Sequence, residues 1–333
     1  MPRRIAAVRT DMPYANLSPD LVLAAVEAAG YPADGRVLAL NSYENRVYQI
    51  GIEDATPVVA KFYRPGRWSD AAILEEHAFA LELAALEIPV VAPLVTDGVT
   101  LHAHEGYRYA LFPRRGGRWP ELGTADDRQW IGRFLGRIHQ AGRAAAFAHR
   151  SRLDVGALGR QSRDFLLRGR WVPDYLAPKY EQLTDTLLEV VEDCADGWRG
   201  ARVLRIHGDC HRGNVLWTDA GPHFVDLDDC TTGPAVQDLW MLLAGDAGEM
   251  RVALTDLLAG YEQFLPFDRR EIALIEPLRA LRMIHYGAWI ARRWADPAFP
   301  RAFPWFAEPR YWEEHYRALE EPLAAVEAPP LEL

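Results

Sequence analysis

Polar side chains gather between two apolar runs in the segment from residue 205 to residue 217. Asp209 precedes Asn214 by five residues, and Asp226 follows the asparagine by twelve. Burying so many polar groups beside Val, Leu, Ile and Phe costs free energy unless they find partners, so their clustering indicates a functional site. The alternative interpretation is a solvated loop followed by an acidic turn.

The order and spacing of these three residues fit phosphoryl transfer from ATP. In that chemistry a loop aspartate accepts the proton of the acceptor hydroxyl, and an asparagine five residues later binds a magnesium ion. An aspartate on the following strand then bridges the metal to the phosphates. Mg²⁺ prefers hard oxygen ligands and keeps several waters, so one carboxylate and one amide oxygen are a reasonable protein contribution.

The run Val58–Lys61 has the pattern of a strand that ends in a phosphate-binding lysine. Lys61 and Lys179 are the only two lysines among 37 basic residues. A compact ammonium and a planar guanidinium are not interchangeable at a tight site, so a lysine kept in an arginine-rich chain indicates a specific role. We therefore predict that Lys61 contacts phosphates, against the alternative of a surface lysine on a strand.

A helix that carries residues 73–77 offers a carboxylate able to pair with this lysine and hold it extended. Glu76 is the predicted partner, and Glu75 is then expected to be a solvent-facing charge. Helical periodicity alone leaves both residues open as the partner.

The expected glycine-rich phosphate loop is missing, because no glycine lies between Gly35 and Gly51. Residues 41–45 occupy its place between two predicted strands. The Ser42 hydroxyl and the backbone N–H groups of a turn are able to cover phosphates. A plain hairpin turn is the alternative for each residue of this segment.

Around these residues the first third of the chain reads as a small β-rich unit. Ser18 is expected to cap a helix that ends at Gly30, and Ser69 opens a helical pattern that runs to about Leu86. Strand-like runs are expected at residues 36–40, 47–52, 57–62, 90–95 and 107–112.

Beyond the Pro- and Gly-rich segment 113–120 the signal is mainly helical. Helices are expected at residues 125–140, 175–191, 235–243, 252–264 and 269–294, with a β interruption from 202 to 229. The sequence therefore predicts a two-lobed α+β fold. Residues 1–113 form a small β-rich ATP-binding lobe, and residues 114–333 form a larger, mostly helical catalytic and substrate-binding lobe. The crevice between them is the expected ligand site.

The composition of the chain indicates which kinds of partner and which cellular location to expect. The 37 basic and 47 acidic residues give a net charge of −10, which argues against a nucleic-acid-binding protein. No window of about 18 residues lacks charges, so no membrane span is expected. Three cysteines without a CxxC pair, and two N-terminal arginines without an apolar run behind them, predict a cytoplasmic protein. We expect a monomer.

The stretch His207–Leu216, HGDCHRGNVL, resembles the HGDxHxGNxL signature of aminoglycoside-phosphotransferase-like kinases. Within that family the chain is most similar to the bacterial stress-response Ser/Thr protein kinases. The similarity runs through residues 40–48, 61–65, 73–77, 224–229, 233–243 and 294–300, and so covers nearly the whole chain. The resemblance implies a protein-kinase-like fold, autophosphorylation, and transfer of the γ-phosphate of ATP to Ser or Thr hydroxyls of a protein substrate.

The same resemblance assigns roles to individual residues. Asp209 would be the proton acceptor, with Asp226 as the second catalytic aspartate. Asn214 and Asp226 would hold Mg²⁺. Ser42 and Lys61 would contact ATP, and the absence of glycine from the phosphate loop is then a family feature.

Other polar residues near the motif receive supporting roles. Asp228 shares a face with Asp226 if the strand there is regular, and would assist metal binding or cap a turn. Asp229 is expected at the surface. Asp238 is expected either to hydrogen-bond the catalytic loop or to serve only as a helix N-terminal carboxylate. His207 and His211 complete no zinc set, so orienting hydrogen bonds are preferred for them.

Two other functions stay open. A small-molecule kinase acting on an amino alcohol, a sugar or an aminoglycoside fits the twelve residues between Asp226 and Asp238, which leave little room for a peptide-docking segment. A metallophosphoesterase is the remote alternative, because its two-metal site needs more His and Asp ligands than the motif offers.

Overall fold

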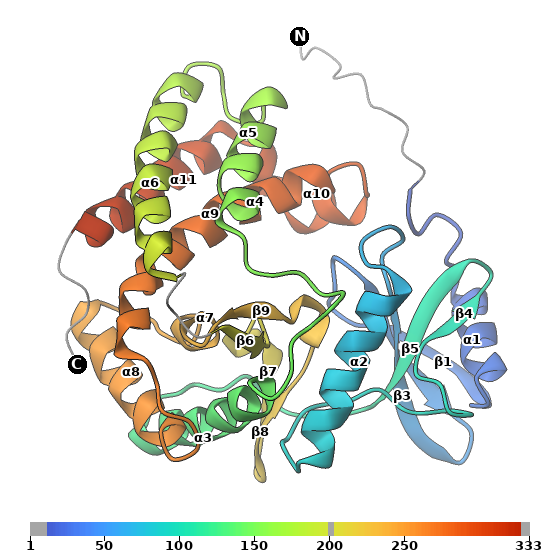
Figure 1. Cartoon of the computed structure of the whole chain (residues 1–333). Helices are drawn as coiled ribbons and strands as arrows, with labels where there is room; N and C mark the ends of the chain where they lie inside the picture. The colour runs from blue at the N-terminus through green and yellow to red at the C-terminus, as the bar shows by residue number, and fades with distance from the viewer. Residues whose placement is uncertain (1–11, 199–202, 328–333) are drawn as a thin grey trace.

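The computed structural model describes residues 12–198 and 203–327. The first eleven residues lie outside these ranges, and they include the two N-terminal arginines used for the expectation of a cytoplasmic protein. The chain forms a small lobe and a larger lobe side by side (Figure 1). The predicted two-lobed α+β fold is confirmed.

A five-stranded antiparallel sheet, in the order β1-β2-β3-β5-β4, forms the small lobe. Its strands are β1 (Ala33–Ala39), β2 (Arg46–Ile52), β3 (Ala55–Phe62), β4 (His102–His104) and β5 (Tyr107–Pro113). Helices α1 (Pro19–Ala28) and α2 (Asp70–Ala85) lie on opposite sides of the sheet (Figure 1). The predicted caps are confirmed, because Ser18 and Ser69 each accept a backbone N–H at 3.2 Å.

Alternation along β3 decides which side chains face α2. Val58, Ala60 and Phe62 belong to the apolar cluster that includes α1. Successive residues of a strand point to opposite faces, so Lys61 points away from that cluster. It contacts Glu76 on α2. The pattern of the strand therefore aims the lysine at the second helix.

The prediction of a strand at residues 90–95 was wrong. Outside its local turn this segment forms an isolated bridge between Val90 and Phe224, with Val91 N donating to Phe224 O (2.9 Å), and a single bond from Leu94 N to Leu111 O (2.7 Å). Pro89 and Pro93 have no N–H to donate, which breaks any regular ladder. The segment instead belongs to the connection from α2 to β4, and it contacts the larger lobe at Phe224 and the sheet of the small lobe at Leu111.

The larger lobe contains a catalytic half around two short strand pairs. Strand β6 (Val203–Ile206) pairs with β9 (Thr231–Pro234), and β7 (Val215–Thr218) pairs with β8 (Gly221–Phe224). Helices α3 (Ala125–Gly142), α7 (Val236–Trp240) and α8 (Ala247–Tyr261) pack against these strands. Each overlaps a helix that the sequence predicted, at residues 125–140, 235–243 and 252–264.

A second half of this lobe is all helical and has its own apolar core. It consists of α4 (Val155–Leu158), α5 (Arg160–Arg168), α6 (Ala177–Trp198), α9 (Ile275–Arg292), α10 (Ala298–Ala302) and α11 (Pro309–Glu327). The single helix predicted over 269–294 is divided, because residues 269–274 form a 3₁₀ turn and α9 begins after it. Pro277 fits only the first turn of an α-helix. Helix α11 was not predicted.

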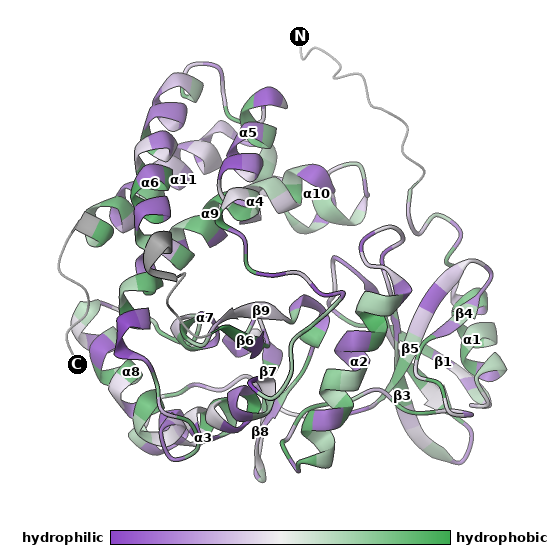
Figure 2. Ribbon diagram, in the orientation of Figure 1, coloured by the Kyte–Doolittle hydropathy of each residue, from purple (hydrophilic) through white to green (hydrophobic). Residues whose placement is uncertain are grey.

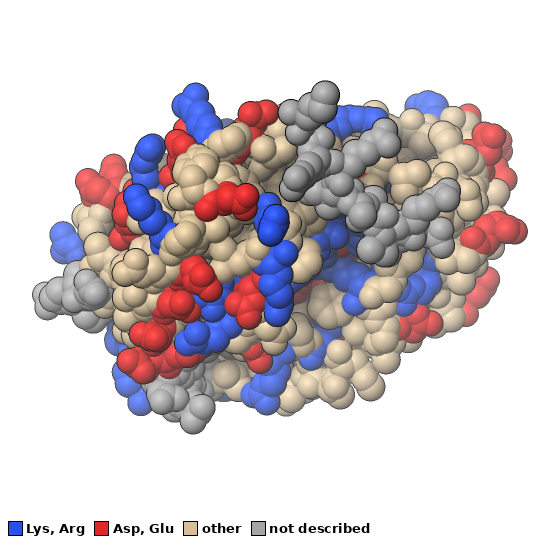
Figure 3. Space-filling model, turned by 90° about the horizontal axis from the view of Figure 1, so that it is seen from above, with Lys and Arg blue, Asp and Glu red and all other residues tan. Residues whose placement is uncertain are grey.

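Hydropathy and charge follow this architecture. Figure 2 shows hydrophobic and hydrophilic residues alternating along α2, which lies at the junction of the lobes. Figure 3 shows acidic and basic side chains interspersed over one face, with basic side chains in the hollow between the lobes. No helix among the described residues is long and apolar enough to cross a bilayer.

Candidate active site

The loop that carries Asp209 is held at its N-terminal end by a buried carboxylate. Its backbone N–H groups at His207 and Gly208 donate to the buried carboxylate of Asp238 at 2.7 and 2.8 Å. His139 on α3 contacts the same carboxylate at 2.9 Å. The predicted support of the loop by Asp238 is therefore confirmed.

Gly208 allows the loop to turn sharply. Its φ is +84°, and a Cβ there would lie 2.2 Å from the backbone oxygen of Asp229. Only glycine fits both conditions without strain. The glycine of the HGD motif thus lets the loop approach the segment that carries Asp226.

Both carboxylate oxygens of Asp209 have cationic or polar neighbours. Arg282 donates to Oδ1 at 2.7 Å, and His211 Nε2 lies 3.5 Å from Oδ2. Burial raises the pKa of Asp209, but the His211 hydrogen bond and the Arg282 charge outweigh burial and lower the pKa to about 2. The carboxylate is therefore ionised at neutral pH and able to accept a proton in a transition state.

Asn214 connects Asp209 to the second acidic segment. Its Nδ2 donates to the backbone oxygen of Asp209 at 2.9 Å, and its own backbone oxygen accepts from Val225 N at 3.0 Å. Asp226, the residue after Val225, has a left-handed backbone with φ +59° and an exposed side chain. Asn214 and Asp226 are thus brought together, as the spacing predicted.

The condition under which Asp226 and Asp228 would share a strand face, a regular strand through both, is not met. Strand β8 ends at Phe224, and residues 227–229 form a 3₁₀ turn. Asp228 consequently points into the interior, where its Oδ1 lies 3.3 Å from Lys61 Nζ and its Oδ2 contacts Arg67. Asp229 is exposed, as predicted, and also contacts Arg67.

Lys61 is buried among three carboxylates. Its Nζ lies 2.9 Å from Asp226 Oδ1 and 3.3 Å from Glu76 Oε1. Burial lowers the pKa of Lys61, but the neighbouring carboxylates outweigh burial and hold the pKa well above its usual value. The lysine is charged and extended toward Asp226. Lys179 is exposed on α6.

Glu75 and Glu76 have different tasks. Glu76 is the glutamate that contacts Lys61. The prediction that Glu75 is a plain solvent-facing charge was wrong, because its carboxylate accepts the backbone N–H groups of His149 (2.7 Å) and Arg150 (2.8 Å), and also that of Ala148. It fixes a loop of the larger lobe to α2.

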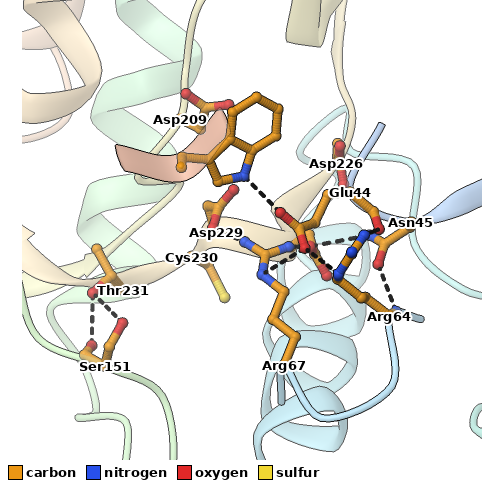
Figure 4. Close-up of polar contacts among 12 residues, drawn as sticks. Glu44, Asn45, Arg64, Arg67, Ser151, Asp209, Asp226, Asp229, Cys230 and Thr231 are labelled. Atoms are coloured by element: carbon orange, nitrogen blue, oxygen red, sulfur yellow. Dashed lines mark hydrogen bonds and ion pairs between the residues drawn. The ribbon is translucent and has the colours of Figure 1, made fainter. Parts of the chain in front are cut away.

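The turn at residues 41–45 is tied into both lobes. The Ser42 hydroxyl donates to the backbone oxygen of Asn45 at 2.8 Å, so it closes the turn. Asn45 Nδ2 donates to Asp228 at 3.1 Å, and Glu44 accepts the indole N–H of Trp289 at 2.6 Å. Figure 4 shows Glu44, Asn45 and Asp226 close together, with the Arg67 side chain directed toward them.

Sequence reasoning missed three polar residues of this site, Asn45, Arg67 and Arg282. Asn45 carried only a turn signal, and each arginine is one of 35 in the chain. No local spacing distinguishes an arginine that reaches a distant carboxylate from one that reaches solvent.

The oxygen donors of the site fit a hard divalent cation whose remaining ligands are phosphate oxygens and water. Because the Asn214 amide nitrogen is turned to Asp209, its oxygen remains as a donor, and the half-exposed Asp226 carboxylate is the second. Within the described part of the chain, no group of three or more His, Cys, Asp or Glu is arranged to hold a metal. The two-metal site that a phosphoesterase requires is therefore not found among these residues.

Comparisons with known proteins agree with this geometry. A model described as "Phosphotransferase enzyme family" matches residues 36–275. Stress response kinase A of Escherichia coli K12 is 46% identical over 321 residues, which cover 96% of this chain and 97% of that protein. A serine/threonine protein kinase, RdoA, of Salmonella typhimurium is equally similar, at 46% identity over the same shares.

Solved structures of lower sequence identity share the fold. An amicoumacin kinase matches with a TM-score of 0.67 and 18% identity, covering 90% of this chain and 93% of its own. A microcompartment-associated aminopropanol kinase matches with the same TM-score and identity, covering 92% and 97%.

Proposed function

The chain belongs to the phosphotransferase enzyme family, together with stress response kinase A, and we propose from this premise that it is an ATP- and Mg²⁺-dependent Ser/Thr protein kinase. In this proposal it acts on itself and on other proteins, as a cytoplasmic monomer. Relatives that share 46% of the sequence over 96% of the chain carry names of such kinases, which supports a protein acceptor.

One observation carries the proposal. The Asn214 side chain bonds to Asp209, the backbone of Asn214 bonds to Val225, the neighbour of Asp226, and Lys61 contacts Asp226 at 2.9 Å. A base, two oxygen donors and a phosphate-binding cation in one place are the parts that phosphoryl transfer requires.

The reaction uses these groups in a defined way. The acceptor hydroxyl oxygen bonds to the γ-phosphorus while Asp209 takes the hydroxyl proton. The bond from the γ-phosphorus to the bridging oxygen breaks, and ADP leaves with its electron pair. Lys61 binds the α- and β-phosphates, and Ser42 and its turn lie over them. Asn214 and Asp226 would hold Mg²⁺, which neutralises charge on the phosphates when bound.

The purified chain with Mg-ATP tests this proposal. Phosphate should appear on Ser or Thr of the chain itself and of a generic substrate such as myelin basic protein, with a metabolite panel assayed in parallel. Asp209→Ala should lower transfer by about 10²–10⁴-fold, the usual contribution of a general base. Nucleotide binding, measured by calorimetry, should stay largely intact. Unchanged turnover in this variant would reject Asp209 as the base.

A small-molecule acceptor is the second candidate. Between Asp226 and Asp238 the chain forms a 3₁₀ turn and then β9, whose four residues are all buried. This short connection offers no extended segment on which a peptide could dock. Transfer to an amino alcohol or sugar, with no transfer to any protein, would favour this candidate over the first.

A further inference from the structure

Helix α9 presents a cation to the catalytic base. Arg282 donates to Asp209 Oδ1 at 2.7 Å, yet 41% of its side chain is exposed. We propose that Arg282 determines acceptor specificity by binding an anionic group, a carboxylate or a phosphoryl group, that lies beside the acceptor hydroxyl of a peptide. The inference rests on the proposed protein kinase activity and names the acceptors that it would prefer.

The contacts of Asp209 supply the first argument. Its Oδ2 already has Asn214 Nδ2 at 3.4 Å and His211 Nε2 at 3.5 Å, and its Oδ1 is held by Arg282. Each carboxylate oxygen has two lone pairs, so Oδ1 can accept the acceptor hydroxyl beside the Arg282 N–H. The guanidinium has further N–H donors, and these can bind an anion on the acceptor that lies next to this hydroxyl, because guanidinium groups pair with carboxylates and phosphates.

The charges around α9 supply the second argument. Four guanidinium groups lie near enough to act on His285, those of Arg67, Arg282, Arg292 and Arg293. Burial first, and then these charges, lower the pKa of His285 to about 4, so the imidazole is neutral.

Carboxylates contact three of these four guanidinium groups. Arg282 contacts Asp209, Arg67 contacts Asp228 and Asp229, and Arg293 contacts Glu44. Arg292 is exposed and packs over the Phe165 ring at 5.0 Å, and among the described residues no carboxylate is paired with it. Figure 3 shows basic side chains in the hollow between the lobes, although the net charge of the whole chain is −10.

A surface for the peptide lies beside the arginine. Tyr286, one turn after Arg282, is 38% exposed and stacks on Trp289 with ring centroids 5.7 Å apart. An exposed tyrosine ring next to a guanidinium suits a peptide that carries an acidic side chain, because the ring supplies contact area and the cation supplies charge recognition.

Peptides with a single serine test the inference. There are four sets of peptides, and they differ in the residue placed near the acceptor serine: Asp, phosphoserine, Ala or Lys. In each set this residue is placed in turn at each of the two positions on either side of the serine. We expect kcat/KM of the wild-type enzyme to be about tenfold or more higher for the best Asp or phosphoserine peptide than for its Ala counterpart, as for a hydrogen bond to a charged group. Lys peptides should be the poorest. A gain with phosphoserine alone assigns the anion as a phosphoryl group.

Two substitutions separate recognition from structural support. Arg282→Gln should reduce the ratio between anionic and Ala peptides to near one, mainly through KM, and Arg282→Glu should invert it in favour of Lys peptides. Arg279→Glu is the matched control, since Arg279 lies one turn earlier on α9 and pairs with Glu276 and Glu321. The wild-type ratio should persist in that variant.

The outcomes that contradict the inference are distinct. Equal losses of kcat for all peptides in Arg282→Gln, with the ratio unchanged, would overturn the specificity role. Transfer from wild-type enzyme to metabolites but to none of the peptides and to no protein would overturn the protein kinase proposal, and this inference with it.

Discussion

Lys61 is a buried cation whose charge is balanced by carboxylates from two lobes. Glu76 belongs to α2 of the small lobe, and Asp226 and Asp228 belong to the turn after β8. A buried charge without partners is costly, so the lysine and the three acids stabilise one another. Phosphates brought by ATP would replace part of this negative charge.

Lys61→Ala should therefore impair the use of ATP. Loss of a charged hydrogen-bond donor costs about 1.5–3 kcal/mol, which corresponds to about ten- to a hundredfold in kcat/KM for ATP. Steady-state kinetics at varied ATP measure this effect. Lys179→Ala, at an exposed site on α6, should change kcat/KM less than about twofold as a surface substitution, and equal effects of both would refute the phosphate role of Lys61.

The two neighbouring glutamates should respond to pH in opposite directions. Burial, opposed by Lys61, raises the pKa of Glu76 to about 7 from an ordinary value of 4.5. Stability from such a group is fully present below pH 4.5 and is lost as the pH rises through 7. Relative to Glu76→Gln, the wild-type protein should lose up to about 3 kcal/mol of unfolding free energy over this interval.

Glu75 provides the matched comparison for this measurement. Burial raises the pKa of Glu75, but three backbone N–H groups, from residues 148–150, outweigh burial and lower it. Its stabilisation is present above the ordinary pKa and is lost as the pH falls. Urea unfolding at pH 5 and pH 8 of Glu75→Gln and Glu76→Gln distinguishes the two, and the same pH trend in both variants would contradict the assignment.

At the scale of elements, α3 and α8 approach each other through glycines. A Cβ at Gly260 would lie 2.0 Å from the backbone oxygen of Gln129, and one at Gly132 would lie 2.0 Å from that of Leu257. Contacts between backbones leave no flexible side chain to move aside. This packing positions His139, which supports Asp238 and hence the catalytic loop.

Gly260→Ala should consequently separate the two helices. Overpacking of a tight interface costs about 1–3 kcal/mol, and more where only backbone can yield. Thermal unfolding should show a lower Tm than for the wild-type chain. Gly116→Ala, whose Cβ would meet no atom within 4 Å, should leave Tm unchanged. A Gly260→Ala variant as stable as this control would show that the helices tolerate separation.

At the scale of the whole molecule, the two lobes are joined by buried charges and by shared core. Asp296, which is buried, accepts from Arg46 at 2.8 Å and from Arg64 at 3.1 Å. Phe79 and Leu83 of α2 belong to the same apolar cluster as Phe224 of the larger lobe. The proposed boundary between residues 113 and 114 thus separates the chain into lobes that share part of their core.

Asp296→Asn should loosen the docking of the turn at residues 41–45. Breaking a buried ion pair by neutralising one partner costs about 3–5 kcal/mol, and here Arg46 and Arg64 of the small lobe both lose their ion pair with Asp296. Hydrogen exchange should accelerate at residues 41–46, and KM for ATP should rise. Asp256→Asn breaks a pair with Arg128 inside the larger lobe and is the control. Equal exchange at residues 41–46 in both variants would contradict a role of Asp296 in joining the lobes.

The sequence alone determined the features that depend on spacing along the chain. The run Val58–Lys61 predicted a strand that ends in the lysine, serine caps predicted the starts of α1 and α2, and the interval from Asp209 to Asn214 fitted a catalytic loop. Only the tertiary structure decided which of Glu75 and Glu76 meets the lysine, and that Arg282 reaches Asp209 from 73 residues away. Periodicity fixes the direction of a side chain within its own element. The residue that the side chain contacts on another element depends on how elements distant in sequence pack together. The whole apolar core determines that packing.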